Sequence, residues 1–307
     1  MTKETINENA PEITTLYKGR MTVKFYPKSH QYWVSVDGEK LKRWKGSTTF
    51  IGIKDKSRAL LSWQQGITAD YLLKIFDGGE RVTRNNILEA VIQSEIQKDK
   101  AADIGNEIHG WAEGYIKYKM KLPGFKKMPE IPDFPEAVTG VNSFLDWDKQ
   151  EKVEYHSTET VIASLEHRYI GTEDVTFTAG GKFCDADFKS SNGLYNGVRA
   201  QTASYAMARM EAGGRKSKGR WALRFSKYTE EEYIKREERK KEIRRMIAKI
   251  KGREYKEYPI KPYQVFEAKF LDNEKGNLER DFNAFLDMKK LTEWDRLTDP
   301  FLCGENW

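Results

Sequence analysis

The sequence predicts an α/β fold in which a mixed central β-sheet is flanked by helices. Alternating apolar and polar runs, typical of strands, recur between residues 151 and 270. Segments with helical spacing separate several of these runs, and the longest alternating run doubles back at Gly180-Gly181. The 307 residues are 38% hydrophobic, which is enough for the core of one large domain or two small ones.

The first half of the chain is expected to form a small sheet and a helical cap over residues 21–150. Residues 1–20 are polar and predict a flexible tail. Residues 21–45 alternate around an Asp37-Gly38 turn and predict an antiparallel meander. Helices are predicted at 57–76, 83–120 and 135–149. Five apolar residues are expected on the buried side of the first helix: Leu60, Leu61, Trp63, Ile67 and Leu72.

The second half, residues 151–307, is expected to contain the main sheet. Strands are predicted at 151–163, 168–190 (as a hairpin), 220–228 and 262–270, and helices at 194–210 and 278–297. An insertion at about 229–258 is dense in both charge signs and predicts an exposed helix. Its basic end could contact phosphates, although a solvated face is the simpler interpretation.

Composition excludes several classes of protein. The 53 basic and 47 acidic residues give a net charge of +6, which is compatible with a nucleic-acid partner without requiring one. Cys184 and Cys303 lie far apart and are the only cysteines, so we expect neither a disulfide framework nor a cysteine-rich metal site. The absence of long apolar stretches and of a signal-peptide core predicts a soluble, cytoplasmic protein without a membrane partner.

The second strand of the hairpin carries the most distinctive pattern of charge. Side chains alternate along a strand, so Asp185, Asp187 and Lys189 share one face. Asp174 lies on the preceding strand, and carboxylates that converge from two strands repel each other unless a cation lies between them. Such oxygen ligands suit Mg²⁺ or Mn²⁺. The alternative is a solvent-facing hairpin whose charges pair across the strands.

Two predicted helices carry pairs of residues four positions apart, which places each pair on one helix face. Gly105 and His109 form the first pair, and Gly105 would allow another backbone to approach closely. A helix-packing site with a half-buried histidine explains this pair equally well. Gln201 and Tyr205 form the second pair, for which an ordinary polar rim is the alternative.

Taken in order, these motifs resemble those of the PD-(D/E)XK nuclease superfamily. The matching segments are Gly105 with His109, the run 171–174 (GTED), the run 187–189 (DFK), and Gln201 with Tyr205. The resemblance covers roughly residues 25–270. It is closest to the RecB-like and phage-type exonuclease branch, which includes the mitochondrial genome maintenance exonuclease. Upstream, residues 30–52 and 56–64 resemble the front end of phage-type members. No single motif is specific, whereas these five segments in the same order are. The resemblance implies a restriction-endonuclease-like core.

The resemblance also implies a function: Mg²⁺-dependent or Mn²⁺-dependent cleavage of DNA, more in the manner of an exonuclease, in phage-type replication, recombination or repair. Single-stranded DNA or duplex ends would be the partner. An endonuclease of the same fold and a catalytically silent DNA-binding module are the alternatives, as is a structural protein in which the motifs are coincidental. Two cysteines cannot hold the iron–sulfur cluster that some relatives carry.

Site residues follow from the same resemblance. Asp174 and Asp187 would hold the metal, with His109 and the backbone carbonyl of Phe188 as further ligands. Glu159 is either an additional acid or a surface residue.

The remaining roles concern water and charge. Lys189 would orient or deprotonate the attacking water and stabilise the transition state. Gln201 and Tyr205 would hold the water network around the metal, or the DNA backbone. Two acids depart from the pattern, because Glu173 stands where relatives usually have an apolar residue and Asp185 is additional. Each is expected either to join the metal site or to face solvent.

Overall fold

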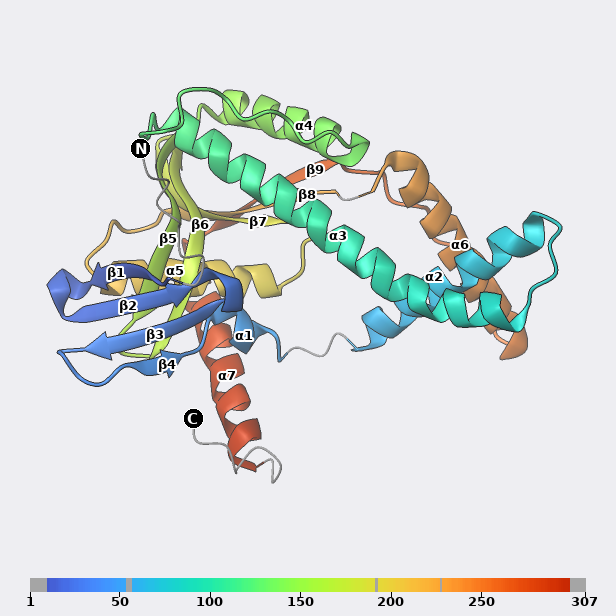
Figure 1. Cartoon of the computed structure of the whole chain (residues 1–307), viewed down its shortest axis with the longest axis horizontal. Coiled ribbons are helices and arrows are strands. Elements are labelled where there is room, and N and C mark those ends of the chain that lie inside the picture. The colour runs from blue at the N-terminus through green and yellow to red at the C-terminus, as the bar shows by residue number, and fades with distance from the viewer. Residues whose placement is uncertain (1–9, 54–56, 191–192, 227, 299–307) are drawn as a thin grey trace, which may run out of the picture.

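The computed structural model describes residues 10–53, 57–190, 193–226 and 228–298. Its strands form two sheets, one of four strands and one of five, and helices surround the larger sheet (Figure 1). The predicted α/β class, with a mixed sheet flanked by helices, is therefore confirmed.

The smaller sheet is antiparallel throughout, in the order β1-β2-β3-β4. Its strands are β1 (Glu12–Leu16), β2 (Met21–Tyr26), β3 (Gln31–Val36) and β4 (Lys42–Trp44). The predicted meander over 21–45 is confirmed, and Asp37 and Gly38 form its turn at φ 49° and 79°. The tail predicted over 1–20 is wrong for residues 12–16, because β1 pairs with β2 along its whole length. Isoleucine and threonine in β1 favour extended backbone, which the polar flanking residues conceal.

Four helices connect the two sheets: α1 (Ser47–Ile51), α2 (Ser57–Asp77), α3 (Arg84–Lys119) and α4 (Pro135–Glu151). A capping box between Thr83 and Asn86 begins α3, which has 36 residues. The buried face predicted for α2 is wrong at Leu60 and Leu61, which are 54% and 56% exposed. The reason is that α2 meets α3 through its later residues, where Thr68 and Tyr71 donate hydrogen bonds to α3.

The larger sheet has the order β5-β6-β7-β8-β9. Its strands are β5 (Glu154–Ser164), β6 (Tyr169–Ala179), β7 (Lys182–Lys189), β8 (Gly219–Phe225) and β9 (Phe266–Asp272). Gly180 and Gly181 have φ values of 54° and 75°, the left-handed conformation that a two-residue hairpin turn requires. Among the described strand pairs of this sheet, only β7 and β8 are parallel, and α5 (Gly197–Glu211) makes the crossover that such a pair needs.

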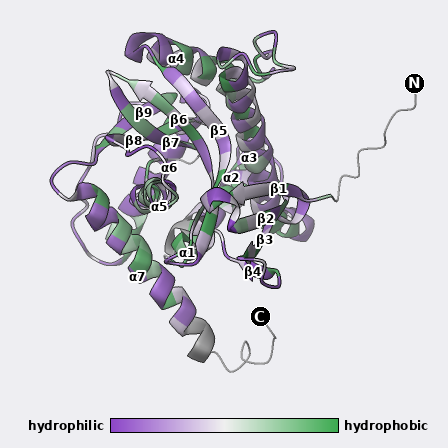
Figure 2. Ribbon diagram, turned by 90° about the vertical axis from the view of Figure 1, so that its left-hand side faces the viewer, coloured by the Kyte–Doolittle hydropathy of each residue, from purple (hydrophilic) through white to green (hydrophobic). Residues whose placement is uncertain are grey.

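Helices cover both faces of this sheet (Figure 2). On one side, α3 and α4 pack over a core to which β7 contributes Cys184, Ala186 and Phe188. On the other side lies α5, backed by α1 and α7 (Asn277–Thr298). Asp185 and Asp187 bond to side chains of α5, so the predicted placement of these two acids on one face of β7 is confirmed. The smaller sheet packs against β5 and β6.

The charged insertion forms α6 (Glu230–Ile250), which Thr229 and Glu232 begin with a second capping box. The helix is shorter than predicted, because Gly252 adopts a φ of 60° and ends it. Figure 1 shows α2, the first half of α3 and α6 extending together from the body that contains the sheets. Among the described residues, no helix combines the length and apolar character needed to span a membrane.

Candidate active site

A cleft of about 440 Å³ lies between α3 and the larger sheet. Three predicted site residues from three different elements line it: His109 of α3, Glu159 of β5 and Asp174 of β6. The other lining residues are Ala102, Gly105, Asn106, Gly110, Glu113 and Ser190. The cleft therefore brings together residues that lie far apart in the sequence.

An irregularity in the β5–β6 ladder places the two cleft acids. Thr158 pairs with Val175 and Thr160 pairs with Glu173, but no pairing joins the intervening Glu159 and Asp174. Glu159 has a φ of 47°, which is left-handed and disrupts regular strand geometry. The pairing of β6 with β7 also stops at Val175, next to Asp174. Both acids thus lie where the regular ladder is interrupted.

Asp174 is tied to β7 through its side chain. Its Oδ2 accepts a hydrogen bond of 2.7 Å from the backbone N–H of Phe188. The sequence does not predict this contact, and the proposed role of the Phe188 carbonyl as a metal ligand stays a prediction. The bond holds the carboxylate beside the end of β7, within the electrostatic field of Asp187.

Asp187 is buried and is held from α5. The side-chain amide of Gln201 donates to Asp187 Oδ1 and to the hydroxyl of Tyr205, each at 2.8 Å. The ammonium group of Lys189 forms an ion pair with Asp187 Oδ2. That oxygen is buried and accepts no hydrogen bond of regular geometry. The structure therefore brings together Asp187, Lys189, Gln201 and Tyr205, as the motifs predict.

The electrostatics of the site reflect crowded carboxylates. Burial raises the pKa of Asp174 well above its usual range, and repulsion by Asp187 raises it further. The pKa of Glu159 rises to about 7, through burial first and repulsion by Glu113 second. For Lys189, burial lowers the pKa, but the carboxylates of Asp187 and Asp174 outweigh it and the pKa is raised overall. Lys189 is therefore an ammonium ion at neutral pH.

His109 is half-buried and makes a T-shaped contact with Phe188, with ring centroids 6.0 Å apart at 79°. Burial lowers its pKa, although Asp187 acts in the opposite direction. The imidazole is thus neutral at pH 7, which is the form that binds metals. One turn earlier, a Cβ atom on Gly105 would lie 2.5 Å from Ser190 Oγ. The glycine permits the close approach of α3 to the residue that follows β7.

Glu173 and Asp185, the two acids that depart from the nuclease motifs, neither join the metal site nor face solvent. Glu173 and Asp185 are fully buried, and both form ion pairs with Arg209 of α5. Arg209 also lies over the ring of Phe183, 4.8 Å from its centroid. Burial raises the pKa of Glu173 to about 7, although Arg209 opposes this. Glu173 and Asp185 therefore form a buried network next to the site, neither in the cleft nor in solvent.

Sequence reasoning missed three polar residues of the cleft, Asn106, Glu113 and Ser190. Glu113 follows His109 by four positions and lies on the same face of α3, so the helical spacing was an available signal. It forms an ion pair with Lys117. Ser190 follows Lys189 directly, and no sequence pattern predicts its place in the cleft.

The fit of these residues to a divalent cation can be judged from their donors. Within the described ranges, no three or more His, Cys, Asp or Glu side chains are close enough together to hold a metal ion. The repulsion between Asp187 and Asp174 nevertheless fits a cation between them, which would share Asp187 Oδ2 with Lys189. Asp174, Asp187 and His109 are the residues that would hold it.

Comparison with known proteins adds little. No protein-family model matches the chain, and no curated protein matches it. A solved structure described as "Crystal structure of SSO0001" aligns over 69% of this chain and 89% of its own, with 9% sequence identity and a TM-score of 0.26. A similarity of that size carries no argument about fold or function.

Proposed function

We propose that this protein is a metal-dependent DNA nuclease whose active site is the cleft between α3, the middle of β6 and the end of β7. The observation that carries the proposal is the ion pair of Lys189 with Asp187, beside a second carboxylate, Asp174, whose pKa is raised. His109 lines the same cleft as Asp174. The finer description of the five-stranded sheet as a restriction-endonuclease-like core belongs to this proposal and is supported by the order of its motifs.

The chemistry follows from the charges of these residues. A bound Mg²⁺ or Mn²⁺ would neutralise the scissile phosphate and lower the pKa of a water molecule. Without metal, the carboxylates of Asp187 and Asp174 raise the pKa of Lys189, so the lysine carries a positive charge beside the site. In the proposed mechanism it would orient or deprotonate the attacking water and stabilise developing negative charge.

Gln201 and Tyr205 are positioning residues in this proposal. Both are buried, Tyr205 to 3% exposure, so neither is placed to contact a DNA backbone in solvent. Their hydrogen bonds fix Asp187 Oδ1 and leave Oδ2 for Lys189 and a cation. The N–H of Phe188 fixes one oxygen of Asp174 in the same way. Fixed carboxylates lose little freedom when they bind a cation.

The resemblance favours an exonuclease, and one experiment separates the alternatives. Linear DNA and closed circular DNA are incubated with the protein in Mg²⁺ and in EDTA, and degradation is followed on gels. We expect Mg²⁺-dependent loss of the linear DNA while the circle survives. Cleavage of both would indicate an endonuclease of the same fold. Binding without cleavage of either substrate would contradict the proposal and favour a catalytically silent module.

A further inference from the structure

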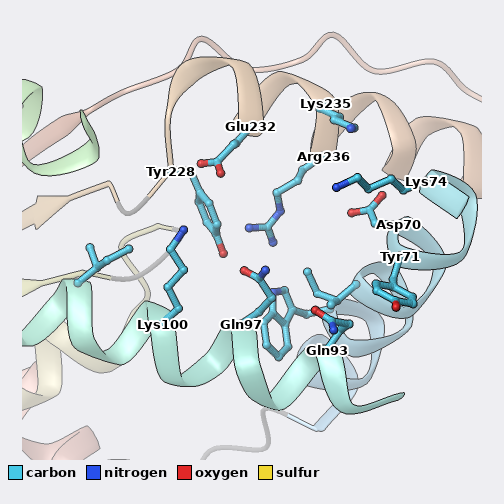
Figure 3. Close-up of a pocket in the computed structure, with 13 residues that line it drawn as sticks. Asp70, Tyr71, Lys74, Gln93, Gln97, Lys100, Tyr228, Glu232, Lys235 and Arg236 are labelled. Carbon is cyan, nitrogen blue, oxygen red and sulfur yellow. The ribbon is translucent and has the colours of Figure 1, made fainter. Parts of the chain in front are cut away.

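A second cavity, of about 320 Å³, lies between α2, α3 and α6 (Figure 3). It is separate from the active-site cleft. Lys100 lines this cavity and His109 lines the cleft, and nine residues of helix, or about two and a half turns, place them on opposite faces of α3. None of its lining residues belongs to the proposed active site.

The cavity carries an excess of positive charge. Four cations line it: Lys74, Lys100, Lys235 and Arg236. Its two acids are already engaged, because Asp70 pairs with Arg239 and Glu232 accepts a 3.0 Å hydrogen bond from the backbone N–H of Thr229. In the part of the chain that the structure describes, none of the four cations forms an ion pair with an acid. An anion in the cavity would relieve their mutual repulsion.

Arg236 is the strongest indication of what that anion is. Its guanidinium lies over the ring of Tyr228, 4.1 Å from the centroid, which fixes its orientation. Its Nη1 is buried and has no hydrogen-bond partner within the described residues. Figure 3 shows Arg236, Lys100 and Gln97 directed into the space between the helices. The planar donors of a guanidinium match the oxygens of a phosphate group.

The other lining residues suit a base next to that phosphate. Trp63, Tyr71 and Tyr228 provide aromatic surface, and bases stack on such surfaces without regard to sequence. Gln93 and Gln97 provide amides that can bond to the edge of a base. The volume is at the lower end of the range for ligand pockets, which is about 300–1,000 Å³. We infer that this cavity binds one nucleotide unit, with its phosphate on Arg236 and Lys100.

The nucleotide unit has two possible sources, a free nucleotide or a residue of single-stranded DNA. Both are tested by equilibrium binding in EDTA, which prevents metal-dependent cleavage. The probes are a fluorescein-labelled single-stranded oligonucleotide, followed by anisotropy, and dAMP, followed by calorimetry. Arg236→Gln should weaken binding of at least one probe about tenfold, as expected for the loss of a charged hydrogen bond.

Arg244→Gln is the matched control, because Arg244 is exposed on α6, does not line the cavity and carries the same charge. We expect it to change affinity by less than about twofold, the effect of one peripheral charge among many. Lys100→Gln is the second test variant, and it decides the outcome if Arg236→Gln does not fold by circular dichroism. Loss of oligonucleotide binding alone assigns the cavity to a DNA strand, and loss of dAMP binding alone assigns it to a free nucleotide.

Wild-type affinity for both probes in both folded variants would overturn the inference. Competition by polyglutamate as effective as that by dAMP would also overturn it, since the cavity would then accept any anion. The affinities are measured in EDTA, so they do not depend on metal-dependent cleavage at the other site. A failure of the proposed nuclease activity would therefore leave the result of this experiment intact.

Discussion

Asp187 makes contacts from two directions, with Gln201 on one oxygen and Lys189 on the other. The hydrogen bond fixes the carboxylate, and the ion pair keeps a positive charge beside it. Because Lys189 is 26% exposed while Asp187 is 1% exposed, the lysine faces the open side of the pair. A phosphate that enters the site would meet the ammonium group before it meets the carboxylate.

Lys189→Ala should abolish cleavage while leaving DNA binding nearly unchanged. Removal of one electrostatic group from an active site costs about a hundredfold or more in rate, whereas affinity for DNA comes from many phosphate contacts. The rate of nucleotide release and the dissociation constant are both measured. Lys182→Ala is the control, because Lys182 lies exposed at the other end of β7. Retained cleavage in a folded Lys189→Ala protein would remove this residue from the active site.

Glu159 should make stability depend on pH in the absence of metal. Its pKa rises from 4.5 to about 7 in the folded protein, so the folded state binds more protons than the unfolded state between these values. The free energy of unfolding should therefore fall as pH rises through this range. Denaturation in urea at a series of pH values checks this. Glu159→Gln should flatten the dependence, and an equal slope in that variant would assign the effect to another group.

The sequence predicted which strand face these residues occupy, but it did not predict all of their contacts. Strand alternation placed Asp185 and Asp187 on one face, because that rule is local. It could not assign Asp185 to Arg209, because that ion pair depends on how α5 packs against the sheet. The position of Glu159 in the cleft depends on its left-handed φ, which no local sequence pattern predicted.

At the scale of elements, the site depends on the approach of α3 to the end of β7. Two glycines of α3 offer a matched test, since a Cβ on Gly105 would lie 2.5 Å from Ser190 Oγ and one on Gly110 would meet nothing within 4 Å. Gly110→Ala should stabilise the protein by about 0.5–1 kcal/mol, the usual gain in a helix.

Gly105→Ala should lack this gain, because the new methyl group displaces Ser190. Overpacking of this kind costs about 1–3 kcal/mol. It should also slow cleavage, since Ser190 follows Lys189. Thermal unfolding and nucleotide release are measured for both variants. Equal stabilisation in the two proteins would mean that α3 and β7 are not in close contact.

Helices and turns that are specified by neighbouring residues in the sequence were predictable. The hairpin turn at Gly180-Gly181 and the helix of 84–119 match the expectation, because glycine pairs and helix caps act locally. Strand β1 was missed because its pairing with β2 is what defines it. The exposed apolar residues of α2 were assigned to a buried face, because periodicity shows that a helix has an apolar side and not whether another element covers it.

For the molecule as a whole, binding of metal to the cleft should stabilise the fold. A cation between Asp174 and Asp187 removes their repulsion and binds only the folded state. At a concentration of about 100 times its dissociation constant, Mg²⁺ or Mn²⁺ should raise the Tm by about 5 °C. Ca²⁺ should stabilise without supporting cleavage, because it activates water poorly. Asp187→Asn should abolish the shift, which calorimetry measures, and an equal shift in that variant would place the metal elsewhere.

In the proposed mechanism, Asp174 and Asp187 hold a metal ion that supports cleavage of DNA. Titration of Mg²⁺ into metal-free protein tests this role, with nucleotide release from end-labelled linear DNA measured for wild type and Asp187→Asn side by side. We predict release that rises with Mg²⁺, saturates, and is absent both in EDTA and in Asp187→Asn. Release that is independent of Mg²⁺, or equal in the two proteins, or absent from both, would show that these carboxylates do not hold a catalytic metal.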